Sequence, residues 1–289
     1  MYDLSIVGAG YWGISMAMMA EEAGMSVCII DSKNSHSGSR NAGGHFSLEW
    51  FKGEFREHME LALEDAERLG FKVDRSGAKI NTISERNKNG KGSFKEKPDW
   101  WTFNPSETLS LRGIDVVGDV VGISGKNKRA IVCTDEDDVW SRNIVVCAGA
   151  WTDQILTNSG YPGVGVSALR GSAVSFKGEH REKVLLHQTT PYRQVSLRNW
   201  GEGRIRVGET TETGTKPTST YDDKMLKTVG HWLGPDDVPV RCYTGFRAMR
   251  KSPFAGMVGD KVYAATGGGR NGGLMGFWAA RKILGELCG

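Results

Sequence analysis

The sequence predicts an α/β fold, because its first 31 residues read as strand, helix and strand in succession. The stretch YDLSIVGAG is an apolar run that reaches a glycine turn, which is typical of a buried strand. YWGISMAMMAEEAG follows as an expected helix that ends at Gly24, and MSVCIID is a second apolar run that ends at an acidic residue. This order predicts a βαβ unit at the start of the chain.

Composition bounds the class of protein. With 289 residues, 39% hydrophobic and 25% charged, the chain can bury one large domain or two interleaved ones. The 39 glycines against 8 prolines favour tight turns and close backbone approaches. Five scattered cysteines without a CxxC pair predict neither a disulfide framework nor a metal site, and favour a cytoplasmic location. We find no signal peptide and no membrane-spanning apolar run, so no membrane partner is expected.

The charge is unevenly placed along the chain. Residues 1–150 hold 18 Lys and Arg against 22 Asp and Glu, whereas residues 151–289 hold 19 against 12. This excess has two interpretations, a solvated basic face or attraction of an anionic ligand or nucleic acid. Part of it lies between residues 170 and 206, in Arg170, Lys177, Arg181, Lys183, Arg193, Arg198, Arg204 and Arg206, against three glutamates.

A GxGxxG motif lies between the first strand and the first helix. Gly8, Gly10 and Gly13 permit a tight turn and leave room for a pyrophosphate at the helix N-terminus, where N–H groups and the helix dipole favour negative charge. Asp31 ends the second strand and is placed to bond a ribose diol. The motif therefore predicts a dinucleotide site of the Rossmann type, for either NAD or FAD.

The remaining elements follow from periodicity and turn residues. Residues 54–69 carry apolar side chains on one helical face, and Gly70 ends that helix. Residues 84–99 are polar and are expected to form an exposed loop, and residues 171–210 are mostly strand-like. The stretches IDVVGDVVGI, RAIVCT and NIVVCAG predict strands, and residues 262–287 predict a strand, a glycine loop and a closing helix.

Residues 37–44, SGSRNAGG, resemble a loop of the FAD-dependent D-amino-acid oxidase/glycine oxidase family of amine oxidoreductases. Further segments resemble that family in the same order and span nearly the whole chain, which disfavours an NAD-dependent dehydrogenase. They are GDVVGI at 118–123, VVCAGAWTDQI at 145–155, LRGSAV at 169–174, YTGFRAM at 243–249 and YAATGGGRNGGLMG at 263–276.

The resemblance implies an α/β fold with a Rossmann-like FAD-binding domain of the glutathione-reductase type and an interleaved antiparallel or mixed β-sheet substrate domain. The FAD-binding domain would comprise 1–50, 106–168 and 245–289, and the substrate domain 51–105 and 169–244. The implied FAD contacts are Gly8, Gly10, Gly13, Asp31, Ser39, Arg40, Asn41, Ala42, Gly43, Gly44, Val120, Ala148, Gly149, Trp151, Gly267, Gly269, Asn271, Gly272, Gly273, Leu274 and Met275.

The same resemblance points to the substrate residues. Arg247, the arginine of YTGFRAM, would anchor a substrate carboxylate, because a planar guanidinium suits that bidentate contact. His45 could face the flavin ring as a polar contact or a covalent tether, or could simply bond nearby backbone. Arg270, Tyr192 and Arg193 are expected at the substrate rim. Trp100 and Trp101 are expected to be packing residues, with stacking on a ring-bearing substrate as the alternative.

The sequence also departs from the family pattern. Gly268 stands where a histidine is usual, and the stretch RKSPFAG lacks the usual aspartate. The chain is short for the family, and the shortfall falls between Gly44 and Pro105, which predicts a reduced substrate cap. A smaller cap with a basic rim favours a substrate larger than free glycine.

The expected activity is therefore FAD-dependent oxidation of the C–N bond of an N-substituted glycine to an imine, with hydrolysis to an amine and glyoxylate. The substrate could be carried on a nucleobase of DNA or tRNA. Two alternatives stay open: an oxidase of free small amino acids or sarcosine-like amines that forms hydrogen peroxide, and a flavin-binding partner protein without turnover.

Overall fold

The computed structural model describes residues 1–75, 77–82, 93–126, 128–178, 184–190, 193–201, 203–208, 212–213 and 239–289. Its strands are β1 (Tyr2–Val7), β2 (Val27–Asp31), β3 (His45–Ser47), β4 (Ala78–Thr82), β5 (Ser93–Lys97), β6 (Trp100–Thr102), β7 (Val116–Val117), β8 (Val120–Lys126), β9 (Arg129–Thr134), β10 (Asp138–Val146), β11 (Ser167–Lys177), β12 (Val184–Thr190), β13 (Arg193–Gly201), β14 (Arg204–Gly208), β15 (Glu212–Thr213), β16 (Pro239–Gly259) and β17 (Val262–Gly268). The helices are α1 (Tyr11–Glu22), α2 (Glu54–Arg68), α3 (Pro105–Ser110), α4 (Thr152–Asn158) and α6 (Gly272–Cys288), with short 3-10 turns η1 (Leu48–Trp50), η2 (Gly149–Trp151) and η3 (Gly269–Asn271).

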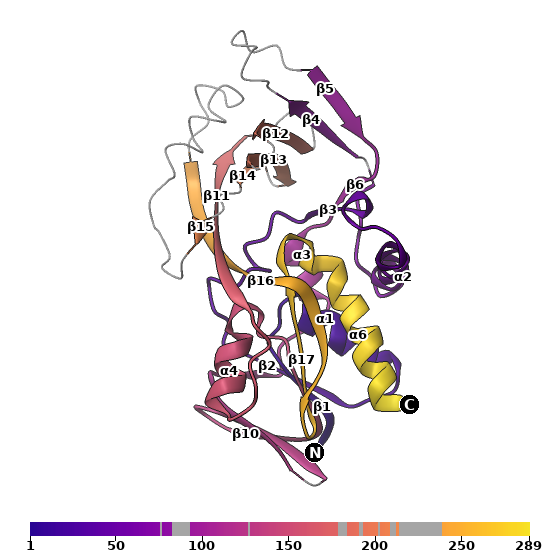
Figure 1. The fold of residues 1–289 in the computed structure, drawn as a ribbon. Helices are drawn as coiled ribbons and strands as arrows, with labels where there is room; N and C mark the ends of the chain where they lie inside the picture. The colour runs from indigo at the N-terminus through magenta and orange to yellow at the C-terminus, as the bar shows by residue number, and fades with distance from the viewer. Residues whose placement is uncertain are drawn as a thin grey trace.

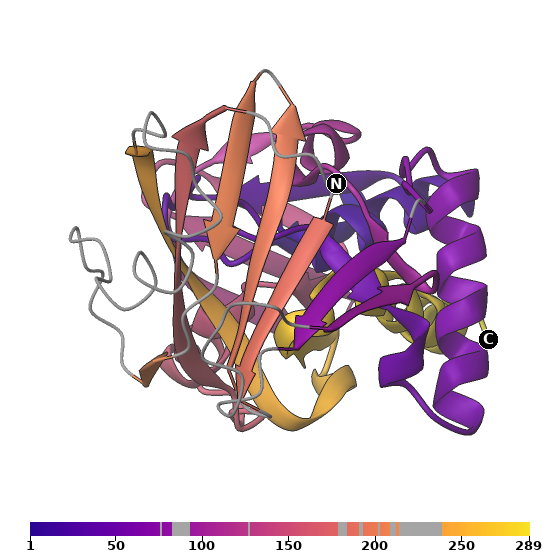
Figure 2. The same ribbon diagram turned by 90° about the horizontal axis from the view of Figure 1, so that it is seen from above.

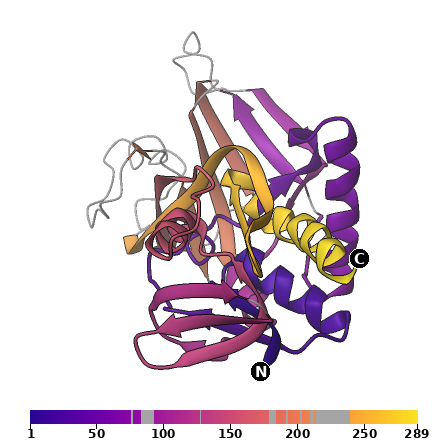
Figure 3. The ribbon, with the colours of Figure 1, turned by 60° about the horizontal axis from the view of Figure 1, so that its bottom comes forward.

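The parallel half of the main sheet runs in the order β17, β10, β1, β2, β7, with every neighbouring pair parallel. The expected βαβ unit is therefore confirmed as β1, α1 and β2. The strands β8 and β9 form a hairpin that pairs antiparallel with β10, as Figure 3 shows at the front. Apolar side chains fill both faces of this half-sheet, with α1, α2 and α6 on one face and α4 with the hairpin on the other.

The second half continues the same sheet in the order β16, β11, β14, β13, β12, β4, β5 (Figure 2). Its pairs are antiparallel except that between β12 and β4, which makes the sheet mixed. The predicted α/β fold with a mixed parallel and antiparallel sheet is confirmed. The long strand β16 joins the halves: its first part pairs with β11 and its second with β17 (Figure 1).

Helix α2 packs on the parallel half of the sheet rather than on the antiparallel half. Met59 and Ala62 are fully buried in the same cluster as α1 and α6, as the helical periodicity predicts. Asp65 is 2% exposed, and its carboxylate accepts hydrogen bonds from Arg281 of α6 (2.9 Å to Nη2) and from Arg68 (2.7 Å). The domain boundaries remain a prediction. Helix α2 falls in the predicted substrate domain, 51–105, but packs on the parallel half of the sheet.

One local expectation is wrong in part. Residues 84–99 do not form a loop throughout, because Ser93–Lys97 pairs with β4 as the last strand of the sheet. Charged side chains such as those of SFKEK are common on edge strands, where they oppose pairing with another chain. The residues 83–92 of that stretch lie outside the described residues. Among the helices that the structure describes, none is both long and apolar enough to cross a membrane.

Candidate functional site

A cleft of about 480 Å³ opens between the carboxyl ends of the parallel strands and the strand pair β11–β16. Ligand clefts of doubly wound sheets occur at this edge, beyond the strand ends. Its walls come from the turn after β1, the stretch 37–46, the link 118–122, the start of α4, part of β16 and the segment 265–273. The sequence motifs that were expected to bind the cofactor thus meet around one cavity.

The first glycine turn is shaped by close backbone approaches. A side chain on Gly13 would overlap the carbonyl oxygen of Gly8, and Gly8 has φ +105° with a virtual Cβ 2.6 Å from the carbonyl oxygen of Cys147. Gly10 provides no side-chain cap for α1, and Ser39 Oγ accepts the N–H of Tyr11 at 3.0 Å. The N-terminus of α1 is therefore bare of its own cap and faces the cleft, which suits a phosphate.

Asp31 lies at the end of β2 and lines the cleft. The N–H of Ala9 donates to its Oδ2 at 2.7 Å, and the N–H of Lys33 donates to its Oδ1 at 2.6 Å. Arg40 pairs with Oδ1 at 3.2 Å and does not itself line the cleft, so it acts on the cofactor site through Asp31. A carboxylate has about four acceptor positions, so a ribose hydroxyl can still donate to Asp31.

The stretch 37–44 follows β16 closely. Ser37 bridges Phe246 in parallel, and the N–H of Phe246 donates to the carbonyl of His36 at 3.0 Å. A side chain on Gly38 would come 2.5 Å from the carbonyl oxygen of Phe246, so only glycine fits there. On its other side, Arg206 of β14 donates to the carbonyl oxygen of Asn41. Strands β14 and β16 of the antiparallel half therefore hold the stretch 37–44 against the cleft.

Arg206 corrects one expectation. It was counted in the basic stretch 170–206 as part of a rim, but it is 5% exposed and its guanidinium stacks on the ring of Tyr243 at 4.4 Å. The reason is register: β14 pairs antiparallel with β11 in the middle of the sheet, so the residue lies inward. Arg181 and Lys183 lie outside the described residues, and Arg193, Arg198 and Arg204 are described in their backbone only.

The segment after β10 closes one side of the cleft. Ala148, Gly149 (φ +59°) and Trp151 all line it, and the hydroxyl of Thr266 donates to the carbonyl of Gly149 at 3.0 Å. The ring of Trp151 meets that of Phe246 edge-on at 5.9 Å. Val120, the first residue of β8, also lines the cleft together with its neighbours.

The second glycine loop, 267–273, also lies in the wall. Gly267 and Gly269 have φ of +89° and +54°, and a side chain on Gly273 would come 2.7 Å from Cζ of Phe103. The buried Oδ1 of Asn271 accepts no hydrogen bond from the described part of the chain. Such an acceptor suits a donor on a bound molecule.

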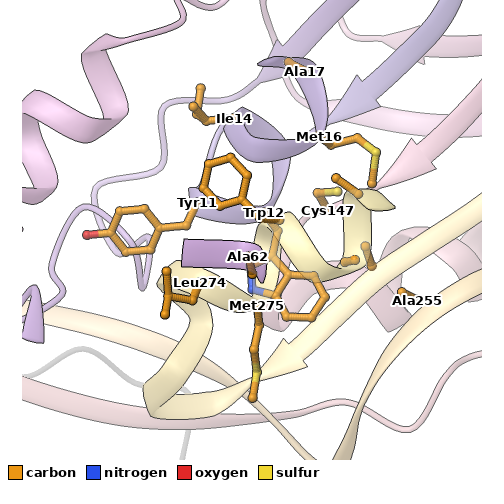
Figure 4. Packing of buried hydrophobic residues seen from close by; sticks show 14 of the residues in the cluster. Tyr11, Trp12, Ile14, Met16, Ala17, Ala62, Cys147, Ala255, Leu274 and Met275 are labelled. Carbon is orange, nitrogen blue, oxygen red and sulfur yellow. The ribbon is translucent and has the colours of Figure 1, made fainter. Parts of the chain in front are cut away.

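Leu274 and Met275 were expected to contact the cofactor, but they are 3% and 6% exposed in the core and do not line the cleft. Figure 4 shows both among the buried residues that pack with α1. The helical period explains this: the glycines at the start of α6 face the cleft, whereas the next turn faces α1. Gly13 does not line the cleft either, because it packs against the carbonyl group of Gly8 in the turn.

The three expected catalytic residues Arg247, His45 and Arg270 all line the cleft. Arg247 comes from β16, where its backbone pairs with Leu169 of β11, and its guanidinium lies over Gly171. His45 stacks in parallel with the ring of Trp100 at 6.5 Å and meets Trp50 edge-on at 6.2 Å. Tyr192 lies outside the described residues, and only the backbone of Arg193 is described.

Trp100 and Trp101 do not line the cleft. Trp100 is 6% exposed and donates to Glu49 at 3.3 Å, and Arg75 lies over the Trp101 ring at 4.5 Å. The structure thus describes both tryptophans as packing residues. The sequence reasoning missed other aromatic wall residues, Tyr11, Trp12, Phe103 and Phe246. Tyr11 and Trp12 occupy the variable positions of GxGxxG. Two large aromatic residues in a row within this motif were the sequence feature that could have indicated aromatic cleft residues.

The buried thiols of Cys28 and Cys147 are not activated for nucleophilic attack. Burial raises the pKa of Cys147, which lines the cleft, far above its ordinary value. Burial first, and the nearby Asp115 carboxylate second, raise the pKa of Cys28 to about 11. Among the residues that the structure describes, no cluster of His, Cys, Asp or Glu is arranged to hold a metal ion.

These features define a dinucleotide-binding oxidoreductase of the flavin type: a glycine cradle at a helix N-terminus, an acidic residue for a ribose and a second glycine loop across the cleft. A family model described as DAO, FAD dependent oxidoreductase, matches residues 97–286. The chain belongs to this family, is an FAD-dependent oxidoreductase, and has FAD as its cofactor. The cradle described above fits that group.

Solved structures share the fold. A glycine oxidase from Bacillus cereus ATCC 14579 is 16% identical, with a TM-score of 0.78 and 98% of this chain and 94% of that chain covered. An iminodiacetate oxidase from Chelativorans sp. BNC1 is 17% identical (TM-score 0.78, 99% and 95% covered). An L-proline dehydrogenase from P. horikoshii is 17% identical (TM-score 0.78, 99% and 92% covered). None of the curated proteins compared matches the sequence significantly.

Proposed function

We propose that the protein oxidises the C–N bond of an N-substituted glycine to an imine, which water hydrolyses to an amine and glyoxylate. The observation that carries this proposal is Arg247, a cation that lines the cofactor cleft from β16. FAD, when bound, supplies the two-electron acceptor for the hydride that leaves the α-carbon. Support also comes from two neighbours of the same fold, which are named for glycine and for iminodiacetate, itself an N-substituted glycine.

Arg247 suits a carboxylate for a geometric reason. Its planar guanidinium lies over Gly171 on the paired strand, where any side chain would collide with it. Because residue 171 has no side chain, the guanidinium of Arg247 has room to lie in the wall of the cleft at this point. A planar fork held in this way binds a carboxylate with two parallel hydrogen bonds, which fixes the orientation of the amino acid as well as its affinity.

The other wall residues orient and shield. Tyr11, Phe103 and Phe246 give the cleft apolar surface, which excludes water from the reacting carbon. His45 is held by the stacked indole of Trp100, so its ring has a defined orientation at the cleft wall. Arg270 adds a second cation at the mouth, where it attracts an anionic substrate.

The proposed FAD contacts are those expected residues that form the wall. We keep the predicted domain division as part of this proposal. The contacts are Gly8, Gly10, Asp31, Ser39, Asn41, Ala42, Gly43, Gly44, Val120, Ala148, Gly149, Trp151, Gly267, Gly269, Asn271, Gly272 and Gly273.

The test is anaerobic reduction of the bound flavin. The purified holoprotein is mixed with glycine, sarcosine, iminodiacetate, other small amino acids and nucleic acid that bears glycine-substituted bases, and bleaching of the flavin absorbance is recorded. We expect N-substituted glycines to bleach the flavin and to yield glyoxylate, with hydrogen peroxide after air is admitted. Bleaching by nucleic acid alone would identify a nucleobase-linked substrate. Bleaching only by unsubstituted amino acids would favour a general amino-acid oxidase, and no bleaching by any amine would refute the proposal.

Arg247→Met isolates the carboxylate contact. We expect the amine concentration for half-maximal bleaching to rise by about tenfold to hundredfold, because a charge-assisted hydrogen bond contributes roughly 1.5–3 kcal/mol. Lys251→Met is the matched control, since Lys251 is an exposed cation on the same strand and does not line the cleft. Equal effects of the two substitutions would show a general electrostatic role instead of an anchor.

A further inference from the structure

Trp12 occupies a variable position of the first glycine motif, yet its indole reaches the second glycine loop. A virtual Cβ on Gly268 would lie 2.9 Å from Cζ2 and 3.1 Å from Nε1 of Trp12, and one on Gly272 would lie 3.4 Å from Nε1. All three residues line the cleft. The indole therefore stands between the N-termini of α1 and α6 and takes the space that a side chain at 268 would need.

The orientation of the indole is fixed from behind. Trp278 of α6 meets it edge-on, with ring centroids 6.5 Å apart and planes at 82°. Trp12 is 8% exposed, and Figure 4 shows it beside Met275, with Tyr11 on the Leu274 side. A ring packed in this way has a defined rotamer, so its Nε1 edge is held at the glycine loop.

The Nε1–H of Trp12 has no hydrogen-bond acceptor within the described part of the chain. A largely buried indole N–H normally finds one, because leaving it without a partner costs free energy. The acceptor that this position offers is a molecule in the cleft. The two glycines that face the Nε1 edge have no side chain to reach it or to block it.

We propose that Trp12 is a cofactor-contacting residue that donates its Nε1–H to an acceptor oxygen of bound FAD and lies against the cofactor. This proposal rests on FAD as the cofactor and not on the amine substrate. Failure of every amine to bleach the flavin therefore leaves it standing, and the tests below use no amine.

Two comparisons on holoprotein test the contact. The first is the retention of FAD on dilution and ultrafiltration: Trp12→Phe, which keeps an aromatic ring but removes the N–H, is expected to weaken FAD binding by about threefold to tenfold. The second is the fluorescence lifetime of the bound flavin, which an indole in contact shortens by electron transfer. Because Trp151 also lines the cleft, lifetimes are compared between Trp151→Phe and the double variant with Trp12→Phe, where we expect lengthening.

Trp278→Phe is the matched control. Trp278 packs on the same indole but does not line the cleft, so FAD retention should stay within twofold of the unsubstituted protein. Unchanged retention in Trp12→Phe together with an unchanged lifetime would overturn the proposal. If Trp12→Phe fails to fold, Trp12→Leu takes its place. The unsubstituted holoprotein gives an independent measurement, because a nanosecond flavin lifetime like that of free FAD would also overturn the contact.

Discussion

The two halves of the sheet build the same cleft by opposite means. The parallel half contributes backbone: glycines that leave room, a bare helix N-terminus and carbonyls that approach to contact distance. The antiparallel half contributes long cationic side chains, with Arg247 in the wall and Arg206 on the carbonyl of Asn41. The comparison teaches that the parallel half makes room for the cofactor mainly where glycine lacks a side chain, whereas the antiparallel half supplies Arg247, the proposed substrate contact.

The largest effect is expected from a substitution that disturbs the close backbone approaches of the parallel half. Gly13→Ala puts a methyl group into the carbonyl oxygen of Gly8, and two backbone segments cannot both yield. We expect a loss of about 2–3 kcal/mol in FAD affinity or stability, as for an overpacked site, measured by flavin retention and thermal unfolding. Gly113→Ala is the control, because a methyl group there meets nothing within 4 Å. If both variants kept FAD equally well, the close approach would not be needed for binding.

A smaller effect is expected where the antiparallel half touches the cofactor side. Arg206→Met removes the donor to the carbonyl of Asn41 and should weaken FAD binding by about tenfold, since hydrogen bonds from charged groups contribute roughly 1.5–3 kcal/mol and neighbouring contacts retain part of the geometry. Arg241→Met is a matched control: Arg241 also stacks on Tyr243, at 5.0 Å, but is exposed. If the FAD dissociation constants of the two variants rose equally, the stacked cluster on Tyr243, and not the contact to Asn41, would be what matters.

The smallest effect is a pH dependence of the parallel half. Cys28 has a folded-state pKa raised to about 11, so the fold favours the neutral thiol. This contribution is complete below the thiol pKa of the unfolded chain, about 8.5, and is lost as pH rises through about 11. Urea unfolding between pH 7.5 and 10.5 should show declining stability, and Cys28→Ala should make the decline shallower. An identical slope in the variant would contradict this assignment.

Much of the fold was predictable because it rests on local signals. The βαβ unit, the helix at 54–69 and the closing helix follow from apolar periodicity and glycine stops, and the structure has each within a few residues. The wall glycines were predictable too, since a glycine between a strand and a helix has few other uses. Placement of Leu274 and Met275 was not, because the direction of a helical face depends on the helix packed against it. The sequence alone predicts a surface position for Arg206, because its burial depends on the strands that pair with β14.

Strand β16 also sets a distance. Its residue Met249 pairs with Gly268 of the second glycine loop, and Arg247 stands two residues earlier on the same strand. Two residues of extended chain span about 7 Å, so covalent geometry fixes the separation along β16 between Arg247, the proposed carboxylate contact, and the residue that pairs with the glycine loop. The strand therefore sets both the distance of Arg247 from the glycine loop and the face of the sheet on which its side chain lies. One residue inserted between those positions would lengthen the gap and turn Arg247 to the opposite face, whereas two would restore the face at a longer reach.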